Sequence, residues 1–217
     1  MVSVERISLA RELLGRAAAC DGSKEDERLQ RNLLIAAAFR EVLTQEPIVV
    51  GDTAEDFWTA DAYHETALDL VTWSLTSREK DLLNELGLTR EGRHWVHEAS
   101  GVPVEIPESR LRGDLARVHR EPTHPGVASI ISSEDLYLDR VRQSTMSPDD
   151  EMLPTYKSSV AIAAANYDRM DWRYVDQAIR DEQEVSRDLM RRIDKRARRA
   201  VRDRLSGSRR KLKRKLK

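Results

Sequence analysis

The chain has 217 residues, of which 40% are hydrophobic and 35% are charged, enough for one sizeable core and a small second subdomain. No apolar run reaches the roughly 20 residues that a membrane-spanning helix needs, residues 1–14 lack the apolar block of a signal peptide, and the single cysteine excludes an internal disulfide. These features exclude membrane-spanning and disulfide-stabilised proteins, and we expect a cytoplasmic one.

The net charge of −1 conceals two segments of opposite charge. Residues 191–217 contain 15 Lys and Arg against 2 Asp, a net charge of +13. Residues 1–190 contain the remaining 22 basic and 36 acidic residues, a net charge of −14. This asymmetry favours either a polyanionic partner for the basic segment or packing of that segment against the acidic remainder.

The first half of the chain combines helical and strand patterns. Apolar residues at helical spacing predict one helix over residues 4–18 and a second from the loop at 21–23 to Val42. The next predicted elements alternate: a strand at residues 48–50, a helix at 53–60, a strand at 67–73 and a helix at 76–86 capped by Ser77. Gly51 ends the first of these strands and forms the turn to the helix.

The second half is predicted to be increasingly helical. Its predicted elements are a hairpin of strands at residues 93–98 and 102–106, a surface loop at 107–125, a strand at 127–131, and helices at 132–143, 155–167 and 171–205. Residues 206–208 (Ser-Gly-Ser) are expected to break the last helix before a basic tail. We therefore predict an α/β (α+β) fold, a small mixed sheet flanked by helices with helical N-terminal and C-terminal parts.

Two acidic residues lie in otherwise apolar predicted strands. Asp69 stands between leucines, and Glu105 follows Val104. A carboxylate in such a strand is unfavourable unless it is paired or binds a metal, and two of them beyond a glycine turn that can approach a phosphate describe a two-metal phosphoryl-transfer site. The alternative is that both acids occupy the solvent face of a half-exposed sheet. The five histidines are interpreted as surface residues rather than metal ligands.

Several short motifs occur in a fixed order around these acids. They are Gly51-Asp52-Thr53-Ala54, Phe57-Trp58-Thr59-Ala60, Tyr63, Ala67-Leu68-Asp69, Val104-Glu105-Ile106-Pro107, Ile131-Ser132-Ser133-Glu134-Asp135-Leu136 with Asp139-Arg140, and Met170-Asp171-Trp172. The set resembles the nucleotidyltransferase superfamily of polymerase-β type, in particular the small prokaryotic branch that includes toxins of toxin–antitoxin and abortive-infection systems. The resemblance covers roughly residues 30–180.

The resemblance implies a fold, an activity and a site. The nucleotidyltransferase-like core would span residues 46–145, between N-terminal helices at 1–45, a C-terminal helical part at 146–205 and a basic tail at 206–217. The activity would be Mg²⁺-dependent transfer of a nucleotide from an NTP to RNA or protein, with an antitoxin protein as a partner. Asp69 and Glu105 would be the catalytic metal ligands, and the turn at Gly51, Asp52 and Thr53 would hold the phosphates.

The chain departs from the family pattern at two positions. Ala67 stands where the family has the first metal-binding acid, and Asp52 stands where the family has a second small residue of the turn. Loss of one charged ligand leaves two cations under-neutralised, so the resemblance implies weak or absent transfer here. Glu65 and Asp52 are the acids near enough in sequence to replace the missing ligand.

The basic C-terminal segment is the second candidate site. The residues expected to contact nucleic acid are Arg198, Arg199, Arg202, Arg209, Arg210, Lys211, Lys213, Arg214, Lys215 and Lys217. Such a charge density predicts salt-dependent binding to a phosphate backbone, and the corresponding alternative function is a non-catalytic nucleic-acid-binding protein. A solvated helix end and weak adhesion to an anionic membrane are the other two interpretations.

Overall fold

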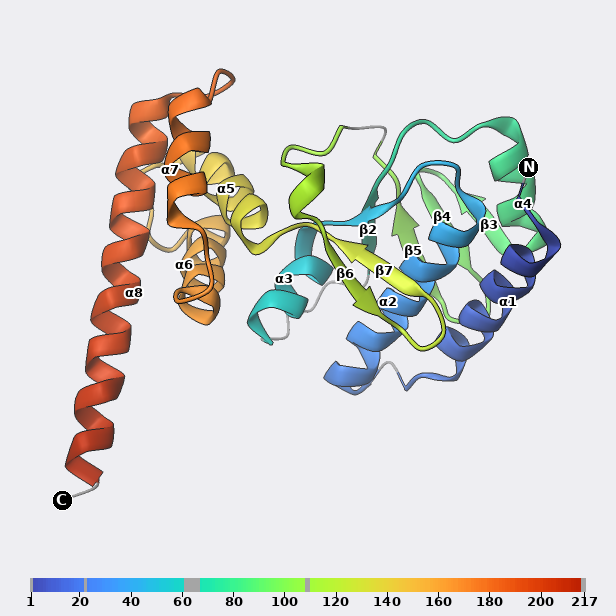
Figure 1. The fold of residues 1–217 in the computed structure, drawn as a ribbon, viewed down its shortest axis with the longest axis horizontal. Helices are drawn as coiled ribbons and strands as arrows, with labels where there is room; N and C mark the ends of the chain where they lie inside the picture. Colours follow the sequence, from blue (N-terminus) through green and yellow to red (C-terminus); the bar gives the residue numbers. More distant parts are fainter. Residues whose placement is uncertain (1, 22, 61–66, 108–109, 216–217) are drawn as a thin grey trace. The chain divides into compact units, whose positions relative to one another are not determined.

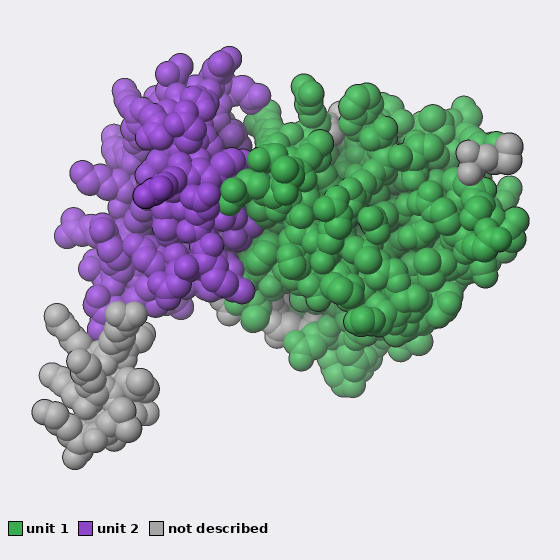
Figure 2. Space-filling view, viewed as in Figure 1, with its two compact units in different colours: residues 1–132 green, residues 133–217 purple. Residues whose placement is uncertain are grey.

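The computed structural model describes residues 2–21, 23–60, 67–107 and 110–215, of which residues 25 and 207–215 are described by their backbone alone. The described residues form an α+β fold that combines helices with a seven-stranded mixed sheet (Figure 1). The chain divides into two units, residues 1–132 and residues 133–217 (Figure 2). The predicted fold class is confirmed, whereas the predicted boundaries at residues 45, 145 and 205 stay predictions.

Unit 1 begins with two helices that pack against each other, α1 (Val4–Ala19) and α2 (Glu25–Val42). The helix α1 begins at Ser3, whose hydroxyl accepts a hydrogen bond from the backbone N–H of Arg6 at 3.4 Å. Its apolar stripe, which includes Leu14 and Ala17, is buried, and α2 contacts the sheet at two of its strands. Both helices were predicted from their apolar spacing.

All the strands of the sheet belong to unit 1. They are β1 (Ile48–Val49), β2 (Leu68–Val71), β3 (Leu88–Glu91), β4 (His94–His97), β5 (Val102–Glu105), β6 (His119–Pro122) and β7 (Val127–Ile130). Their order is β3-β4-β5-β2-β1-β7-β6. The pairs β2–β5 and β1–β7 are parallel, and the other neighbouring strands are antiparallel. The centre of the sheet therefore carries the strands on which both acids were predicted.

Two parts of the sheet differ from the prediction. The segment 107–125 was expected to be a surface loop, yet it contains a 3₁₀ turn (Leu115–Arg117) and β6, which pairs with β7. The strand β3 was not predicted, because three of its four residues are exposed and its sequence, Leu-Thr-Arg-Glu, lacks the alternation of a half-buried strand. The strands β3 and β6 lie at the two edges of the sheet. They are held by hydrogen bonds to β4 and β7 rather than by burial of an apolar face.

Two helices connect the strands of unit 1. The first, α3 (Gly51–Thr59), follows β1 directly, and the second, α4 (Ser77–Glu85), follows β2. The helix α4 is capped by Thr76 rather than by Ser77, in a capping box with Glu79. Glu79 also accepts hydrogen bonds from the backbone N–H and hydroxyl of Thr44, both at 2.7 Å, so one buried carboxylate joins the start of α4 to the end of α2.

Unit 2 is helical. Its helices are α5 (Ser133–Gln143), α6 (Pro154–Asn166), α7 (Trp172–Asp181) and α8 (Arg187–Lys215), with a 3₁₀ turn at Ser144–Met146. In the described part of the chain, no helix combines the length and the apolar character that a membrane span requires. The predicted single helix at 171–205 is wrong, because α7 and α8 are separate and lie side by side (Figure 1).

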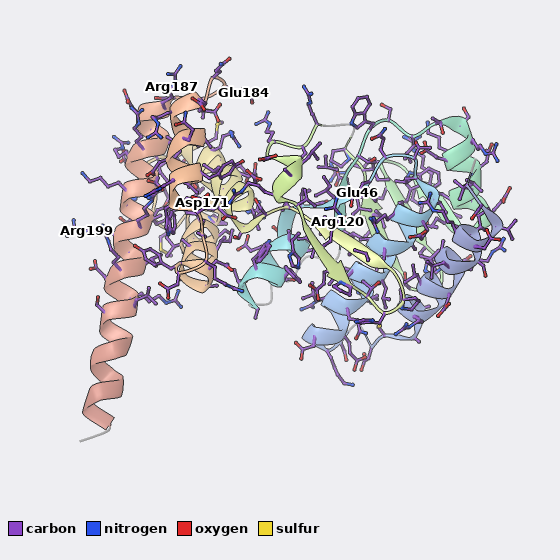
Figure 3. The ribbon with its side chains drawn as sticks, viewed as in Figure 1. Glu46, Arg120, Asp171, Glu184, Arg187 and Arg199 are labelled. Atoms are coloured by element: carbon purple, nitrogen blue, oxygen red, sulfur yellow. The ribbon has the colours of Figure 1, made fainter. Side chains whose placement is uncertain are left out.

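The turn between α7 and α8 is held by Glu182. Its carboxylate accepts hydrogen bonds from the backbone N–H groups of Gln183 at 2.9 Å and Glu184 at 2.7 Å, and it forms an ion pair with Arg142 at 2.8 Å. Figure 3 shows Glu184 and Arg187 at this turn. The predicted break at residues 206–208 is also wrong, since the backbone of α8 continues to Lys215. One glycine in a helix costs only about 1 kcal/mol.

Candidate functional site

Asp69 and Glu105 lie next to each other on neighbouring strands. They are register partners in the parallel pair β2–β5, and neighbouring strands are about 4.8 Å apart. In both strands the flanking residues Leu68, Leu70 and Val104 are buried, whereas the two acids are half-buried. Because side chains alternate along a strand, both carboxylates project from the same, less buried face of the sheet.

Gly51 lies directly against Asp69. Its φ is +63°, and a Cβ built at this position would collide with the carboxylate of Asp69, whose Cγ would be only 3.2 Å away. The backbone N–H of Val50 also donates to the carbonyl oxygen of Asp69 at 3.0 Å. Glycine is required here because other residues are strained at positive φ and would displace the carboxylate. The start of α3, Asp69 and Glu105 therefore lie close together. The apolar–polar alternation of the sequence indicated a shared face for the two acids, but it did not indicate that Gly51 lies against Asp69.

Glu105 has two basic neighbours. Its carboxylate lies 3.4 Å from the guanidinium of Arg93 and 3.5 Å from the imidazole Nε2 of His94. The side chain of Arg93 is 74% exposed, and exposed ion pairs of this kind contribute about 0–1 kcal/mol. Glu105 can therefore exchange this pair for another cation at little cost in stability.

The other two residues of the predicted phosphate turn have different surroundings. Thr53 is buried, and its hydroxyl accepts a hydrogen bond from the side-chain amide of Asn32 at 3.2 Å. Asp52 is half-buried in the first turn of α3, where a carboxylate is favoured by the helix dipole. Of the three turn residues, Gly51 borders Asp69, Asp52 adds negative charge to the first turn of α3, and Thr53 contacts α2.

The donor set fits one Mg²⁺ better than two. Ala67 precedes β2 and supplies no ligand, and Glu65 falls outside the described residues. Within the described ranges, no three His, Cys, Asp or Glu side chains form a group that could hold a metal ion. Mg²⁺ is commonly held by one or two carboxylates, with waters and substrate phosphates completing its shell. Asp69 and Glu105 meet that requirement, but they do not supply the ligands of a two-metal site.

The predicted nucleic-acid contacts on α8 separate into two groups. Arg198 is paired with Asp194 at 2.7 Å and Asp176 at 2.6 Å, and its guanidinium lies over the ring of Trp172, 4.4 Å from the centroid. Asp194 in turn accepts a hydrogen bond from Tyr137, a fully buried residue, at 2.9 Å. Arg198 therefore belongs to the packing of unit 2.

The remaining predicted contacts are exposed or lie beyond the described side chains. Arg199 and Arg202 are exposed on α8, and Figure 3 labels the first of them. The members outside the described side chains are Arg209, Arg210, Lys211, Lys213, Arg214, Lys215 and Lys217. Sequence reasoning did not single out Arg180 of α7, which faces α8. The sequence does indicate the basic side of α8 that Arg180 faces, because Arg191, Lys195, Arg198 and Arg202 recur at helical spacing.

Two further polar residues, Glu46 and His97, make structural contacts that the sequence pattern does not predict. Glu46, just before β1, forms an ion pair with Arg120 of β6 at 2.9 Å (Figure 3) and accepts a hydrogen bond from Ser129 of β7 at 2.5 Å. His97 is buried, and its Nδ1 lies 3.0 Å from the hydroxyl of Ser100. The interpretation of all five histidines as surface residues is therefore wrong for His97.

The geometry at Gly51, Asp69 and Glu105 is the feature on which a functional assignment can be built. Comparison of the sequence with protein-family models and with curated proteins finds no match. The resemblance to the nucleotidyltransferase superfamily therefore stays a prediction from the ordered motifs.

Proposed function

We propose that unit 1 carries a nucleotidyltransferase-type site that binds an NTP together with one Mg²⁺ and transfers nucleotide weakly or not at all. The observation that carries the proposal is the contact of three elements: Gly51 against Asp69, and Asp69 in register with Glu105. The family motifs place a glycine turn and two acids at one site, and the proximity of Gly51, Asp69 and Glu105 supports the proposal. The position of both acids on the less buried face is also what a solvent face of a half-exposed sheet would give, so the proximity of Gly51 to Asp69 is the observation that favours the proposal.

Asp69 and Glu105 would hold the Mg²⁺, which when bound neutralises phosphate charge. The turn at Gly51 leaves room for Asp69 because it carries no side chain. The first turn of α3 presents backbone N–H groups of the kind that bind phosphate, although Asp52 in the same turn opposes an anion there. Weak binding of a triphosphate is therefore expected.

Ala67 accounts for the expected loss of transfer. Nucleotidyl transfer with two metals needs negative charge to hold both cations close together. With Ala67 in place of an acid, two carboxylates remain, enough for the nucleotide-bound metal alone. The acceptor implied by the resemblance is the end of an RNA or a protein hydroxyl.

The proposal is tested by restoring the missing ligand. Wild-type protein and the Ala67→Asp variant are incubated with radiolabelled NTPs, Mg²⁺ and tRNA, and labelling of RNA and protein is measured. We expect Ala67→Asp to label an acceptor well above wild type, Ala67→Asn to match wild type, and Ala67→Asp combined with Asp69→Asn to show no label. A folded Ala67→Asp variant that neither binds NTP nor labels an acceptor contradicts the proposal.

A second candidate function is nucleic-acid binding through the basic segment of α8. The specific observation in its favour is that the helix continues unbroken to Lys215, with Arg199 and Arg202 exposed along it. Binding of a labelled RNA that weakens steeply with salt is expected. Deletion of residues 206–217 should reduce it, and salt-independent binding would contradict a phosphate contact.

A further inference from the structure

A basic pocket lies between the two last helices of unit 2. It has a volume of about 400 Å³, and it is open to solvent. The basic residues that line it are Arg180 from α7 and Arg191, Lys195, Arg198 and Arg202 from α8; the acids are Asp176 and Asp194. The pocket thus has five basic residues against two acidic ones.

The two acids of the pocket are both engaged by Arg198, as described above. Arg180 donates to the side-chain oxygen of Gln177, a neutral partner, at 2.7 Å. Across the described side chains, no acidic group lies within ion-pair distance of Lys195 or Arg202. Arg191 makes an exposed ion pair with Asp188 at 3.5 Å. The positive charge that remains available to a ligand is therefore that of Arg180, Lys195 and Arg202.

A neighbouring side of α8 is different. Arg192 pairs with Asp149 at 3.1 Å, and Arg196 pairs with Glu151 at 3.8 Å. Arg196 also lies over the ring of Tyr156, 4.4 Å from its centroid. The cations on this side of the helix have acidic or aromatic partners. The excess positive charge of the pocket is therefore a local feature and does not follow from the basic composition of α8 alone.

The arrangement of the excess cations fits a linear polyanion. Arg191, Lys195 and Arg202 fall on one side of α8. With a rise of 1.5 Å per residue, Lys195 lies about 6 Å from Arg191 and about 10 Å from Arg202 along the helix axis. The lining includes one apolar residue, Ile179, and no aromatic ring. The ring of Trp172 is covered by Arg198. A pocket of this kind can contact phosphates but offers no surface on which a base could stack.

We propose that the α7–α8 pocket binds the phosphate backbone of a nucleic-acid strand, without reading its sequence. The inference rests on the second candidate function for its partner, but it places the contact within the folded helices rather than in residues 206–217. It does not depend on chemistry at Asp69. Electrostatic binding of this type weakens with salt in proportion to the number of phosphates neutralised.

The test removes two of the cations from the full chain. A fluorescein-labelled, mixed-sequence single-stranded RNA is titrated with wild type and with the Lys195→Gln/Arg202→Gln variant over a range of salt concentrations. We expect weaker binding by the variant and a plot of log K against log [salt] that is shallower by about 1.4, since each contact with a single strand contributes about 0.7. The control, Arg78→Gln/Lys157→Gln, removes two exposed cations outside the pocket and should leave the slope unchanged.

A chemical readout locates the contact without a variant. Acetylation of Lys195 by a water-soluble ester, measured by mass spectrometry, should slow severalfold when the RNA is present, whereas acetylation of Lys157 should not. If wild type binds RNA but the pocket variant keeps its slope and Lys195 stays unprotected, the pocket inference is overturned and tail binding stands. If wild type binds no nucleic acid, both fail. Binding of inorganic polyphosphate with no binding of RNA also overturns the inference.

Discussion

Asp69 and Glu105 are register partners on the parallel strands β2 and β5, so their carboxylates leave the sheet on the same face. Gly51, the first residue of α3, lies directly against the first of them. This relationship places two acids that are far apart in the sequence beside each other on one face of the sheet. Its consequences for stability and for ligand binding can be separated by substitution.

Replacing Gly51 with alanine should disrupt the site as well as strain the backbone. Positive φ costs a non-glycine residue about 1–2 kcal/mol, and the added Cβ would push the carboxylate of Asp69 out of its position. The control is Gly87→Ala, where φ is +84° but no atom lies within 4 Å of the added Cβ. We expect similar losses of unfolding free energy in urea for both variants, and loss of metal–nucleotide binding for Gly51→Ala alone. Equal binding by the two variants would contradict the role of Gly51.

Glu79→Gln should destabilise unit 1 by about 1–3 kcal/mol, because the carboxylate accepts four hydrogen bonds from Thr44 and Thr76. Burial alone would raise the pKa of Glu79, but these hydrogen bonds outweigh it, and the pKa lies below its ordinary value of 4.5. A carboxylate with a lowered pKa stabilises the fold above its unfolded-state pKa, and this contribution is lost as pH falls through the folded-state value.

The difference in unfolding free energy between wild type and Glu79→Gln should therefore be constant near neutral pH and shrink below about pH 4.5. Urea unfolding monitored by circular dichroism across this range measures it. Glu85→Gln, at an exposed position of the same helix, should behave as wild type. If this difference in unfolding free energy stays constant as the pH falls below 4.5, the charge of Glu79 does not stabilise the connection between α2 and α4.

Arg198→Met should destabilise unit 2 by about 1–3 kcal/mol, because it removes a charged hydrogen-bond partner from a mostly buried carboxylate. The variant leaves Asp194, which is buried beside Tyr137, without its cation. Arg199→Met, one residue further along α8, should have almost no effect because Arg199 is exposed. Asp194→Asn in the Arg198→Met background should recover part of the loss. If the Arg198→Met and Arg199→Met variants have equal unfolding free energies, Arg198 does not contribute to the stability of unit 2.

The sequence predicts the central strands and the N-terminal helices because each has a clear apolar period. It does not predict edge strands such as β3, whose stability comes from pairing with β4 rather than from burial. It also fails at the end of α7, where Glu182 closes a turn with a partner 40 residues away. A long-range contact of this kind leaves no local pattern.

The candidate site was predictable in its residues but not in its geometry. The acids were identified from their apolar neighbours, whereas the register of β2 with β5 is set by the whole sheet. On α8, residue type alone could not separate Arg198, which is paired and half-buried, from Arg202, which is exposed. The distinction comes from Asp176 of α7 and from Asp194, one turn earlier on α8, which both pair with Arg198.

The most direct test of the account is binding of Mn²⁺ in place of Mg²⁺, followed by electron paramagnetic resonance, with and without a non-hydrolysable NTP analogue. We expect wild type to bind the metal together with the analogue, and Asp69→Asn and Glu105→Gln each to weaken this binding about tenfold or more. Glu98→Gln, at an exposed position beyond β4, should bind as wild type does. Equal binding by wild type, Asp69→Asn and Glu105→Gln would contradict the account.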